Sequence, residues 1–397
     1  MTSLTAPPLS LYVHLPWCVR KCPYCDFNSH PVPSAGIPER AYLAALLADL
    51  DDSAPAVAGR EVVSVFFGGG TPSLFADHAI GAILARLRDL LPVADDVEVT
   101  LEANPGTVER GAFAAYRAVG VNRVSLGAQS FDDRRLAALG RIHVADEVRV
   151  AVGELRTAGI DNFNLDLMYG LPAQSPAEAI RDVEQAIELG PAHISHYQLT
   201  LEPGTAFERR PPPLPDEEAI FAMQASCQAR LADAGYVQYE VSAYARPARR
   251  CRHNLNYWTF GDYLGIGAGA HGKVTDASGG RVIRTERVRQ PARYIAAADA
   301  GQRSAGERGV DSSELAFEFL LNALRLVEGF DERTFESRTG LDWETVSATV
   351  DRARASGLLE QTGAGRWAAS HRGRLFLNDL QAMFLPERPR GGQRRGA

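Results

Sequence analysis

Three cysteines, Cys18, Cys22 and Cys25, form a C-x3-C-x2-C pattern directly after the apolar segment Leu9–Leu15. Thiolates are preferred ligands of soft metal ions and of iron–sulfur clusters. A cluster of four irons takes four ligands, whereas this loop supplies three thiols. One iron would therefore remain open to a small chelating molecule.

An open cluster iron is the arrangement that binds S-adenosylmethionine (SAM) through its amino and carboxylate groups, so that an electron can cleave the sulfonium. The alternative is structural zinc, held by the three cysteines and a histidine such as His14 or His30, because closed zinc sites take four nitrogen or sulfur ligands. Zinc ligands usually come as two separated pairs, and no matching second pair follows in this sequence. The spacing therefore favours an iron–sulfur cluster.

The composition is typical of a soluble globular protein. The chain has 397 residues, of which 45% are hydrophobic and 23% charged. This length predicts two or three domains, although a single barrel can take up well over half of it. The formal net charge of −7 gives no electrostatic reason to expect nucleic acid as a partner.

Cysteine usage and the first residues indicate a cytoplasmic protein. Five cysteines, three of them in one loop, do not form a disulfide framework and fit a reducing compartment. The start of the chain, MTSLTAPPLS, lacks the basic region and apolar core of a signal peptide. No window reaches the roughly 18 consecutive apolar residues of a membrane-spanning helix.

The elements that must position the cysteines alternate between two periodicities. Short β-type runs are expected at Leu9–Leu15, Val62–Phe67, Val97–Glu102, Arg123–Gly127, Asn162–Met168 and His193–Leu201. Helical spacing of apolar residues is expected at Glu39–Leu50, Asp77–Leu91, Val108–Val119, Ala145–Ala158 and Pro176–Leu189. Six consecutive βα units predict an α/β fold, a partial (β/α)6 barrel of the TIM type that is partly open.

Unusual polar residues follow these predicted strands at one common edge. The cysteine loop follows the first strand, Gly68-Gly69-Gly70-Thr71-Pro72 the second, and Glu102-Ala103-Asn104-Pro105 ends the third. The remaining strands end at or carry Gln129, Asp166, Gln198 and Glu202. Barrel chemistry gathers at the carboxyl ends of the strands, so we expect these residues to line one site.

Two of these features also have a structural interpretation. Glycines at 68–70 let a backbone approach a ligand, and they also make tight turns. Glu102 and Asp166 are carboxylates on strands that should be buried, where a charge needs a partner. Ribose hydroxyls, the ammonium of SAM or Arg141 would each serve, and a structural ion pair is the alternative.

The motifs YVHLPWCVRKCPYCDF, GGGTPS, LEANP, LGAQSF, DLMYGLP and YQLTLEPGT occur in this order along the chain. Together they resemble the radical SAM family of oxygen-independent coproporphyrinogen oxidases and the related HemW-type haem chaperones, over nearly the whole chain. The resemblance implies that Cys18, Cys22 and Cys25 hold a [4Fe–4S] cluster. It also implies that SAM is contacted by Tyr12, Tyr24, Gly69, Gly70, Thr71, Glu102, Gln129, Arg141 and Asp166, with Asp166 a ribose partner. Tyr12 and Tyr24 could equally be core aromatics.

Two departures from the oxidase pattern point to the chaperone side of the family. The oxidase has a fourth cysteine one intervening residue after the third, where this chain has Phe27 in Cys25-Asp26-Phe27. It also has a long N-terminal extension, whereas about eight residues precede the first predicted strand here. Phenylalanine cannot replace a thiol, so the resemblance implies no coproporphyrinogen oxidase activity, while leaving SAM cleavage open.

The segment Arg252-His253-Asn254-Leu255-Asn256-Tyr257-Trp258 is similar to the HNxxYW motif of HemW-type proteins. The resemblance makes His253 the candidate axial haem ligand, with Tyr257 and Trp258 packing on the porphyrin. The alternative is a hydrogen-bonded structural histidine in a loop. Cys227 is expected to pack in a helix, Cys251 to be a spectator, and His271 has no assigned role.

The chain divides into four predicted segments. Residues 1–8 are expected to be disordered, 9–300 to form the barrel with the HNxxYW segment, 301–385 to form a smaller winged-helix-like domain, and 386–397 to be a disordered basic tail. In the C-terminal part, helices are expected at Ser312–Val327, Thr334–Thr339, Trp343–Ala355 and His371–Phe384, with a hairpin at Leu358–Ala369. Its helices lack a clear basic recognition face, so DNA binding is not expected.

The resemblance therefore implies a haem chaperone that binds haem, a [4Fe–4S] cluster and SAM, and transfers haem to an acceptor haemoprotein, such as a membrane-associated respiratory one. An electron donor would be a further partner if SAM is cleaved. The first alternative is a radical SAM oxidoreductase acting on coproporphyrinogen III or another tetrapyrrole. The second is a zinc-stabilised scaffold, which iron and sulfide analysis would distinguish.

Overall fold

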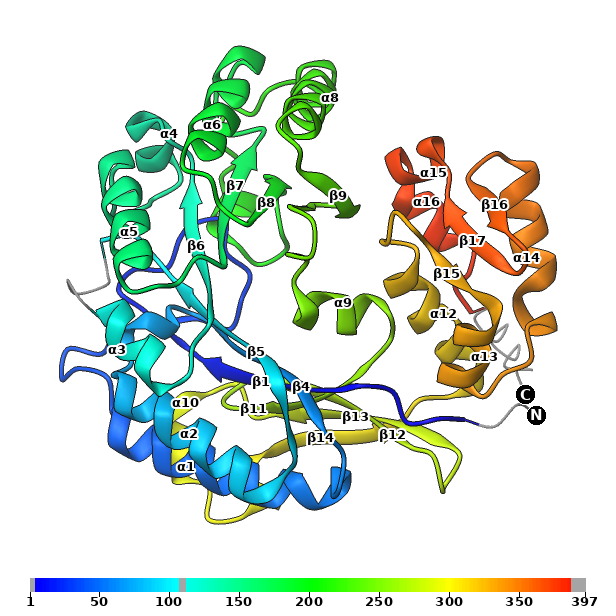
Figure 1. The fold of residues 1–397 in the computed structure, drawn as a ribbon, viewed down its shortest axis with the longest axis horizontal. Coiled ribbons are helices and arrows are strands. Elements are labelled where there is room, and N and C mark those ends of the chain that lie inside the picture. The colour runs from blue at the N-terminus through cyan, green and yellow to red at the C-terminus, as the bar shows by residue number, and fades with distance from the viewer. Residues whose placement is uncertain (1–3, 107–111, 387–397) are drawn as a thin grey trace, which may run out of the picture.

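The six predicted strands form the parallel centre of a curved sheet (Figure 1). The computed structural model describes residues 4–106 and 112–386. Strand β1 pairs with β4, and the sheet continues in chain order to β8 with every pair parallel. The bounds are β1 Leu9–Leu15, β4 Val62–Gly69, β5 Val93–Ala103, β6 Arg123–Gln129, β7 Phe163–Tyr169 and β8 His193–Gln198. Within the described residues the sheet ends in two edge strands and does not close, which confirms the partial barrel.

Helices cover the outer face of this sheet (Figure 1). Their apolar residues pack on the strands because they recur on one side of each helix. The bounds are α1 Glu39–Ser53, α2 Asp77–Leu90, α3 Ala112–Val119, α4 Asp133–Ala138, α5 Ala145–Thr157, α6 Pro176–Glu188, α7 Ala206–Arg209 and α8 Glu217–Asp233. The predicted start of the third helix, at residues 108–111, lies outside the described residues.

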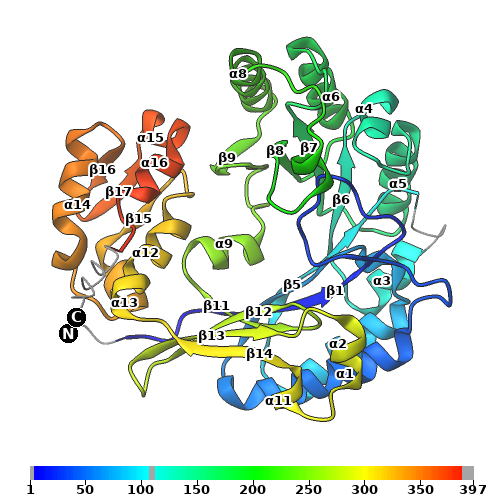
Figure 2. The ribbon, with the colours of Figure 1, turned by 180° about the vertical axis from the view of Figure 1, so that it is seen from behind.

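The sheet has further strands that the sequence did not predict. On one side β8 is followed by β10 Ala243–Ala245 and β9 Val237–Glu240. On the other side β1 pairs in parallel with β11, and an antiparallel ribbon of β12, β13 and β14 follows (Figure 2). The bounds are β11 Asp262–Ile266, β12 His271–Asp276, β13 Arg281–Arg287 and β14 Ser304–Gly309. The sheet thus continues past residue 300, the expected domain boundary.

A short helix, α9 Arg252–Trp258, lies on the inner side of the curved sheet. It contacts β1, β4 and α12 of the C-terminal domain. The HNxxYW segment is therefore helical, so the loop assumed for His253 in its structural alternative is not observed. Two more short helices, α10 Pro291–Ala296 and α11 Ala300–Arg303, precede β14.

The C-terminal domain has the element order of a winged helix. Helix α12 precedes β15, then α13 and α14, and a hairpin of β16 and β17 completes a three-stranded sheet. The predicted last helix is split into α15 and α16. The bounds are α12 Ser312–Ala323, β15 Phe330–Asp331, α13 Glu332–Thr339, α14 Glu344–Ala355, β16 Leu359–Gly363, β17 Arg366–Ala369, α15 His371–Leu375 and α16 Leu377–Ala382.

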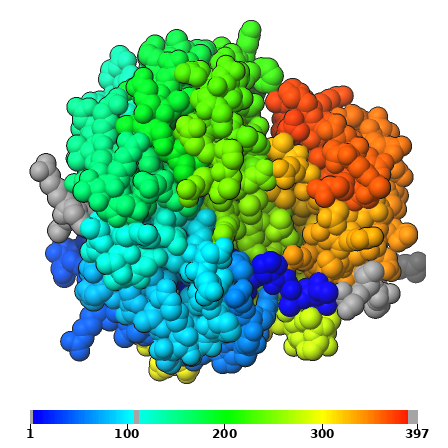
Figure 3. All heavy atoms as spheres, viewed as in Figure 1, coloured from blue at the N-terminus to red at the C-terminus, as the bar shows by residue number. Residues whose placement is uncertain are grey.

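Residues 4–8 lie against the folded chain, although they were predicted to be disordered; residues 1–3 of that predicted segment lie outside the described residues. Thr5 donates its backbone N–H to the carbonyl of Ser337 at 2.8 Å, and Leu4 packs on the C-terminal core. Figure 3 shows this blue segment reaching the C-terminal domain. Residues 387–397, most of the predicted tail, lie outside the described residues. No helix in the described ranges is long and apolar enough to cross a membrane.

Candidate functional site

The cysteine loop leaves the carboxyl end of β1 and is closed at its base by two short parallel strands. These are β2 Trp17–Cys18 and β3 His30–Pro31. Val32 donates its N–H to the Cys18 carbonyl at 2.9 Å, and His30 donates to Pro16 at 2.7 Å. The loop between them is therefore fixed at both ends while its thiols remain half-buried.

The three thiols line one cavity but do not converge on a single point. Burial raises the pKa of Cys18 and of Cys25, and the neighbouring cysteines add to the effect. Among the described residues no three Cys, His, Asp or Glu side chains are close enough to hold one metal ion. Zinc requires such convergence, whereas the separate irons of a cluster take one thiolate each. The donor set therefore fits a [4Fe–4S] cluster better than zinc.

Arg141 contributes positive charge beside the cysteine loop. Its Nη1 lies 3.7 Å from the Sγ of Cys22. Its Nη2 donates to the carbonyl of Gly127 at 2.7 Å and also to Asn104 Oδ1. Arg141 was predicted to contact SAM, and the structure places it against both the cavity and the thiol of Cys22.

The cavity beside the thiols, which we call the SAM cavity, has a volume of about 350 Å³. This is within the size range of small-molecule sites. It brings together most of the predicted site residues: Cys18, Cys22, Cys25, Tyr24, Gly69, Gly70, Thr71, Glu102, Gln129, Arg141 and Asp166. Tyr12 and His253 are the two predicted residues that do not line it.

The glycine triplet allows β4 to approach the end of β1. Gly70 donates its N–H to the Leu15 carbonyl at 2.9 Å, and a Cβ on Gly70 would lie 2.5 Å from the Trp17 carbonyl oxygen. Gly69 has a φ of 113°, and a Cβ there would lie 2.5 Å from the ring of His14. Both interpretations of the triplet therefore hold, because these glycines pack tightly and also line the SAM cavity.

Glu102 and Asp166 place two carboxyl groups in the same cavity. Asp166 accepts hydrogen bonds from Ser125 Oγ at 3.0 Å and from Asn164 Nδ2 at 2.8 Å. Glu102 accepts one from the Gly69 N–H at 3.1 Å. Burial, reinforced by Asp166, raises the pKa of Glu102 to about 8. The cavity therefore favours a ligand that brings positive charge or hydroxyl donors.

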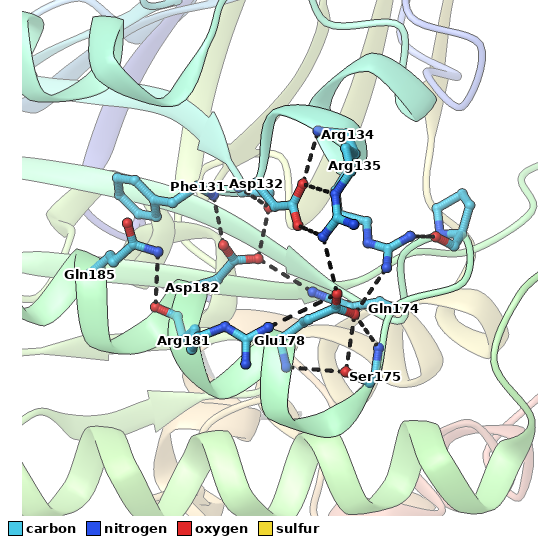
Figure 4. Close-up of polar contacts among 12 residues, drawn as sticks. Phe131, Asp132, Arg134, Arg135, Gln174, Ser175, Glu178, Arg181, Asp182 and Gln185 are labelled. Atoms are coloured by element: carbon cyan, nitrogen blue, oxygen red, sulfur yellow. Dashed lines mark hydrogen bonds and ion pairs between the residues drawn. The ribbon is translucent and has the colours of Figure 1, made fainter.

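The bend that carries Gln129 into the cavity is held from outside the barrel. Gln129 has a φ of 66°, an uncommon conformation for a residue other than glycine. In the next turn of chain, the buried carboxylate of Asp182 on α6 accepts from the Phe131 N–H at 2.6 Å and from Ser130 Oγ at 2.8 Å (Figure 4). This anchoring keeps the strained end of β6 in place.

Tyr12 faces a second cavity that adjoins the SAM cavity. Its hydroxyl lies 2.9 Å from Nδ1 of His14, whose Nε2 lies 2.9 Å from the carbonyl oxygen of Asn28. A carbonyl only accepts, so His14 Nε2 carries the proton and Nδ1 accepts from the tyrosine. Burial lowers the pKa of His14 to about 4, which keeps the ring neutral.

His253 is enclosed inside the barrel, toward the amino ends of β1 and β4. It is 1% exposed, its Nδ1 lies 3.0 Å from Ser64 Oγ, and its Nε2 lies 3.0 Å from the Tyr257 hydroxyl. Burial lowers the pKa of His253 to about 3. The predicted axial ligand is therefore not presented to solvent or to either cavity in this structure. Haem ligation by His253 would require α9 to open.

Sequence reasoning did not assign several residues that line the SAM cavity. Ser125, Gly127, Met168 and Tyr197 lie on the inner faces of β6, β7 and β8. Alternation along the strands could have found Ser125 and Gly127, because they share a face with Gln129. Tyr197 is 42% exposed although it lies in a strand, because its ring faces the cavity.

Two family models match the chain. The Radical SAM superfamily matches residues 12–186, which include the cysteine loop, the second half of β1 and the strands β4 to β7. The HemN C-terminal domain matches residues 310–376. The second match begins directly after β14, which agrees with a domain boundary after Gly309.

Relatives match over nearly their whole length. The heme chaperone HemW of Escherichia coli (strain K12) is 48% identical over 381 residues, 96% of this chain and 99% of the relative. That of Haemophilus influenzae is 46% identical over 385 residues, with 96% and 99% covered. That of Mycobacterium tuberculosis (strain H37Rv) is 36% identical over 394 residues, 97% of both chains.

A solved structure has the same fold. The coproporphyrinogen III oxidase HemN of Escherichia coli, a radical SAM enzyme, superposes with a TM-score of 0.80. The match covers 96% of this chain and 90% of the oxidase at 23% identity. At this identity the likeness supports the barrel and the C-terminal domain, and not the oxidase reaction.

Proposed function

The chain belongs to the HemW family of radical SAM proteins, and from that membership we propose that it is a haem chaperone that carries haem to an acceptor haemoprotein. Its cofactors are a [4Fe–4S] cluster and SAM, and its cargo is haem. The observation that carries this function is 48% identity to a heme chaperone along 96% of the chain. Phe27 supports it, because a side chain without a metal ligand stands where the oxidase has a fourth cysteine.

Different residues of the SAM cavity would bind the cluster and SAM. Cys18, Cys22 and Cys25 would hold three irons of the cluster, with the guanidinium of Arg141 beside the sulfur of Cys22. The fourth iron would take the amino and carboxylate groups of SAM. Glu102 and Asp166 would accept hydrogen bonds or charge from the rest of SAM, with Asp166 at the ribose. The bound cluster supplies electron transfer to SAM.

The proposal includes a compartment, a haem acceptor and an electron donor. We place the protein in the cytoplasm, because its thiols must stay reduced to hold a cluster. The acceptor would be a haemoprotein, such as a membrane-associated respiratory one. An electron donor would be needed only if SAM is cleaved. Independently of SAM cleavage, the bound cluster and SAM would control haem release by changing the affinity of the protein for haem.

Haem transfer to an apo-haemoprotein tests the function directly. Anaerobically reconstituted protein is loaded with one haem and mixed with apo-myoglobin as a neutral acceptor, and the Soret band reports transfer. Loading that saturates at one haem, followed by complete transfer, is the expected result. Absence of saturable loading, together with 5′-deoxyadenosine formation from SAM on adding a tetrapyrrole, would favour the oxidoreductase instead. Equal haem affinity with and without the cluster would contradict cluster control alone.

The raised pKa of Glu102 predicts that SAM binding strengthens with pH. Below about pH 8 the Glu102 carboxyl is protonated. It then lacks the negative charge that attracts the positive groups of SAM and accepts their hydrogen bonds. Each pH unit below this value should weaken SAM binding by up to about tenfold, and the affinity should level off above it. Calorimetric titration of the reconstituted protein across this range measures the effect.

The Glu102→Gln variant is the control for that titration. It should bind SAM more weakly than wild type above pH 8. Below pH 8 it should lack the part of the pH dependence of SAM affinity that comes from Glu102. SAM titrates by its own amino group in both proteins, so only the difference between the two curves reports Glu102. Parallel curves for wild type and variant would show that Glu102 does not contact SAM in its ionised form.

A further inference from the structure

A second cavity of about 360 Å³ opens beside the SAM cavity. The two share Phe27, Gly69 and Glu102 in their walls. We call it the histidine cavity, and its walls are Tyr12, His14, Phe27, Asn28, Gly69, Glu102, Tyr257, Tyr263, Gly269, His271 and Arg289. It thus combines aromatic rings, an imidazole and a guanidinium next to the cluster-binding loop.

Two histidines line this cavity, and one of them has a nitrogen available. Both ring nitrogens of His14 are hydrogen-bonded and its ring is buried. The side chain of His271, in contrast, is 63% exposed, and its Nδ1 faces Glu286 Oε1 at 3.8 Å. Glu286 pairs directly with His271 across β12 and β13. The separation of 3.8 Å is too long for a hydrogen bond, so Glu286 is a neighbouring carboxylate, the kind of group that supports a histidine when its other nitrogen binds metal.

The other walls suit a flat, anionic macrocycle. Tyr257 and Tyr263 meet edge to face with centroids 4.5 Å apart, so their rings form a firm aromatic wall. Phe27 is 60% exposed at the junction of the two cavities, where its ring can cover a porphyrin face. Arg289 is exposed at the rim, and a guanidinium pairs well with a propionate carboxylate.

We propose that haem binds in the histidine cavity with Nε2 of His271 as its axial ligand, Phe27 on the porphyrin and Arg289 at a propionate. This inference rests on the proposed haem-chaperone function and names its cargo site. In this proposal the HNxxYW segment forms part of the cavity wall, whereas the resemblance implied that its histidine binds the haem iron. Tyr257 of that segment lines the cavity, while His253 holds Tyr257 from behind through the hydrogen bond between His253 Nε2 and the Tyr257 hydroxyl.

An accessible site also fits a cargo that must leave. A haem seated between exposed side chains such as His271 and Phe27 keeps one edge in solvent, so an acceptor can reach it. Ligation by His253 would bury the iron beneath α9 and displace the hydrogen bond of whichever ring nitrogen binds it, to Ser64 or to Tyr257. The shared wall also places the haem beside Glu102 and Gly69 of the SAM cavity.

Haem titration of reconstituted wild type and variants, followed by the Soret band and by electron paramagnetic resonance of the ferric haem, tests the site. His271→Ala should weaken binding by about tenfold or more and change the ferric signal, because the axial ligand is lost. Arg289→Ala and Phe27→Ala should each weaken binding without changing the axial-ligand signal. His78→Ala is the matched control, since its side chain is 73% exposed on α2, and it should bind as wild type does.

Each outcome separates this inference from the function on which it rests. Wild-type affinity and ferric signal in His271→Ala would overturn the proposed ligand, and loss of the signal in His253→Ala with an unchanged melting temperature would move the ligand to α9. Saturable binding by wild type in either case keeps the chaperone function. No saturable binding by wild type would remove both.

Discussion

Replacing Cys22 with alanine is expected to leave the reconstituted protein without its four-iron cluster. The three thiols come from one loop whose base is closed by β2 and β3, so the described chain offers no thiol nearby to take over. Losing one of three protein ligands leaves two irons without a thiolate. Iron should fall from about four atoms per chain to a small fraction of that, with loss of the brown colour and of the reduced-cluster resonance.

Cys227→Ala is the matched control for this prediction. Cys227 is fully buried in α8, away from the SAM cavity, and its thiol packs as a small apolar group. The control should keep its iron and sulfide. A Cys22→Ala protein with full iron and sulfide would show that the cluster sits elsewhere, while zinc in place of iron in wild type would support the scaffold alternative.

The parallel strands were predicted well because local pattern determines them. β1 has the predicted bounds, and the predicted starts of β4, β6 and β8 agree with the structure. Each is a short, mostly buried run, and the helical segments that alternate with these runs favour a parallel sheet. The site residues at their carboxyl ends followed from this order, so Gly69, Glu102, Gln129 and Asp166 were found without coordinates.

The ribbon from β11 to β14 was not predicted, because its pairing is not local. β11 lies beside β1 although about 250 residues separate them in sequence. Its register depends on Gly265 and Gly272, where the strands approach so closely that a Cβ on Gly265 would lie 1.8 Å from the His271 carbonyl oxygen. Such glycines read as loop residues in a sequence.

The position of His253 also depends on pairing that is not local. The resemblance made it the candidate haem ligand, with a hydrogen-bonded structural histidine as the alternative, and two serines decide where it lies. Ser10 of β1 and Ser64 of β4 are 2.7 Å apart, and they connect His253 with Asn256 of the same helix. The sequence around a single serine on a strand does not indicate which distant residue it will hydrogen-bond. The same limit concealed His271, whose carboxylate neighbour Glu286 is recognisable only once β12 and β13 are paired.

The buried pair of Asp262 and Lys273 supports the second large prediction. Their side chains are 0% and 2% exposed, and Nζ lies 2.7 Å from Oδ1. Asp262 also accepts from Arg60 at 2.9 Å and from the Thr275 N–H at 2.7 Å. Lys273 Nζ lies 4.2 Å from the centre of the Phe260 ring, which belongs to the core of the C-terminal domain. The pair therefore joins β11 to β12 beside Phe260, whose ring packs into the core of that domain.

Asp262→Asn should lower the free energy of unfolding by about 3–5 kcal/mol at neutral pH, because it leaves a buried ammonium and a guanidinium without their anion. Denaturant titration followed by fluorescence measures this loss. Asp96→Asn, which breaks an exposed pair with Arg252, is the control and should change nothing measurable. An equally stable Asp262→Asn protein would mean that the buried charge pair does not stabilise the fold.

The pH dependence of that variant distinguishes a lost charge pair from lost packing. Burial lowers the pKa of Lys273 from 10.5 to about 8, and Asp262 acts in the opposite direction. Between these two values the unfolded chain binds the lysine proton more tightly than the native chain, so stability rises with pH. Without Asp262 the native pKa falls further, and this rise should begin at a lower pH. A deficit that stays constant from neutral to alkaline pH would instead indicate lost packing.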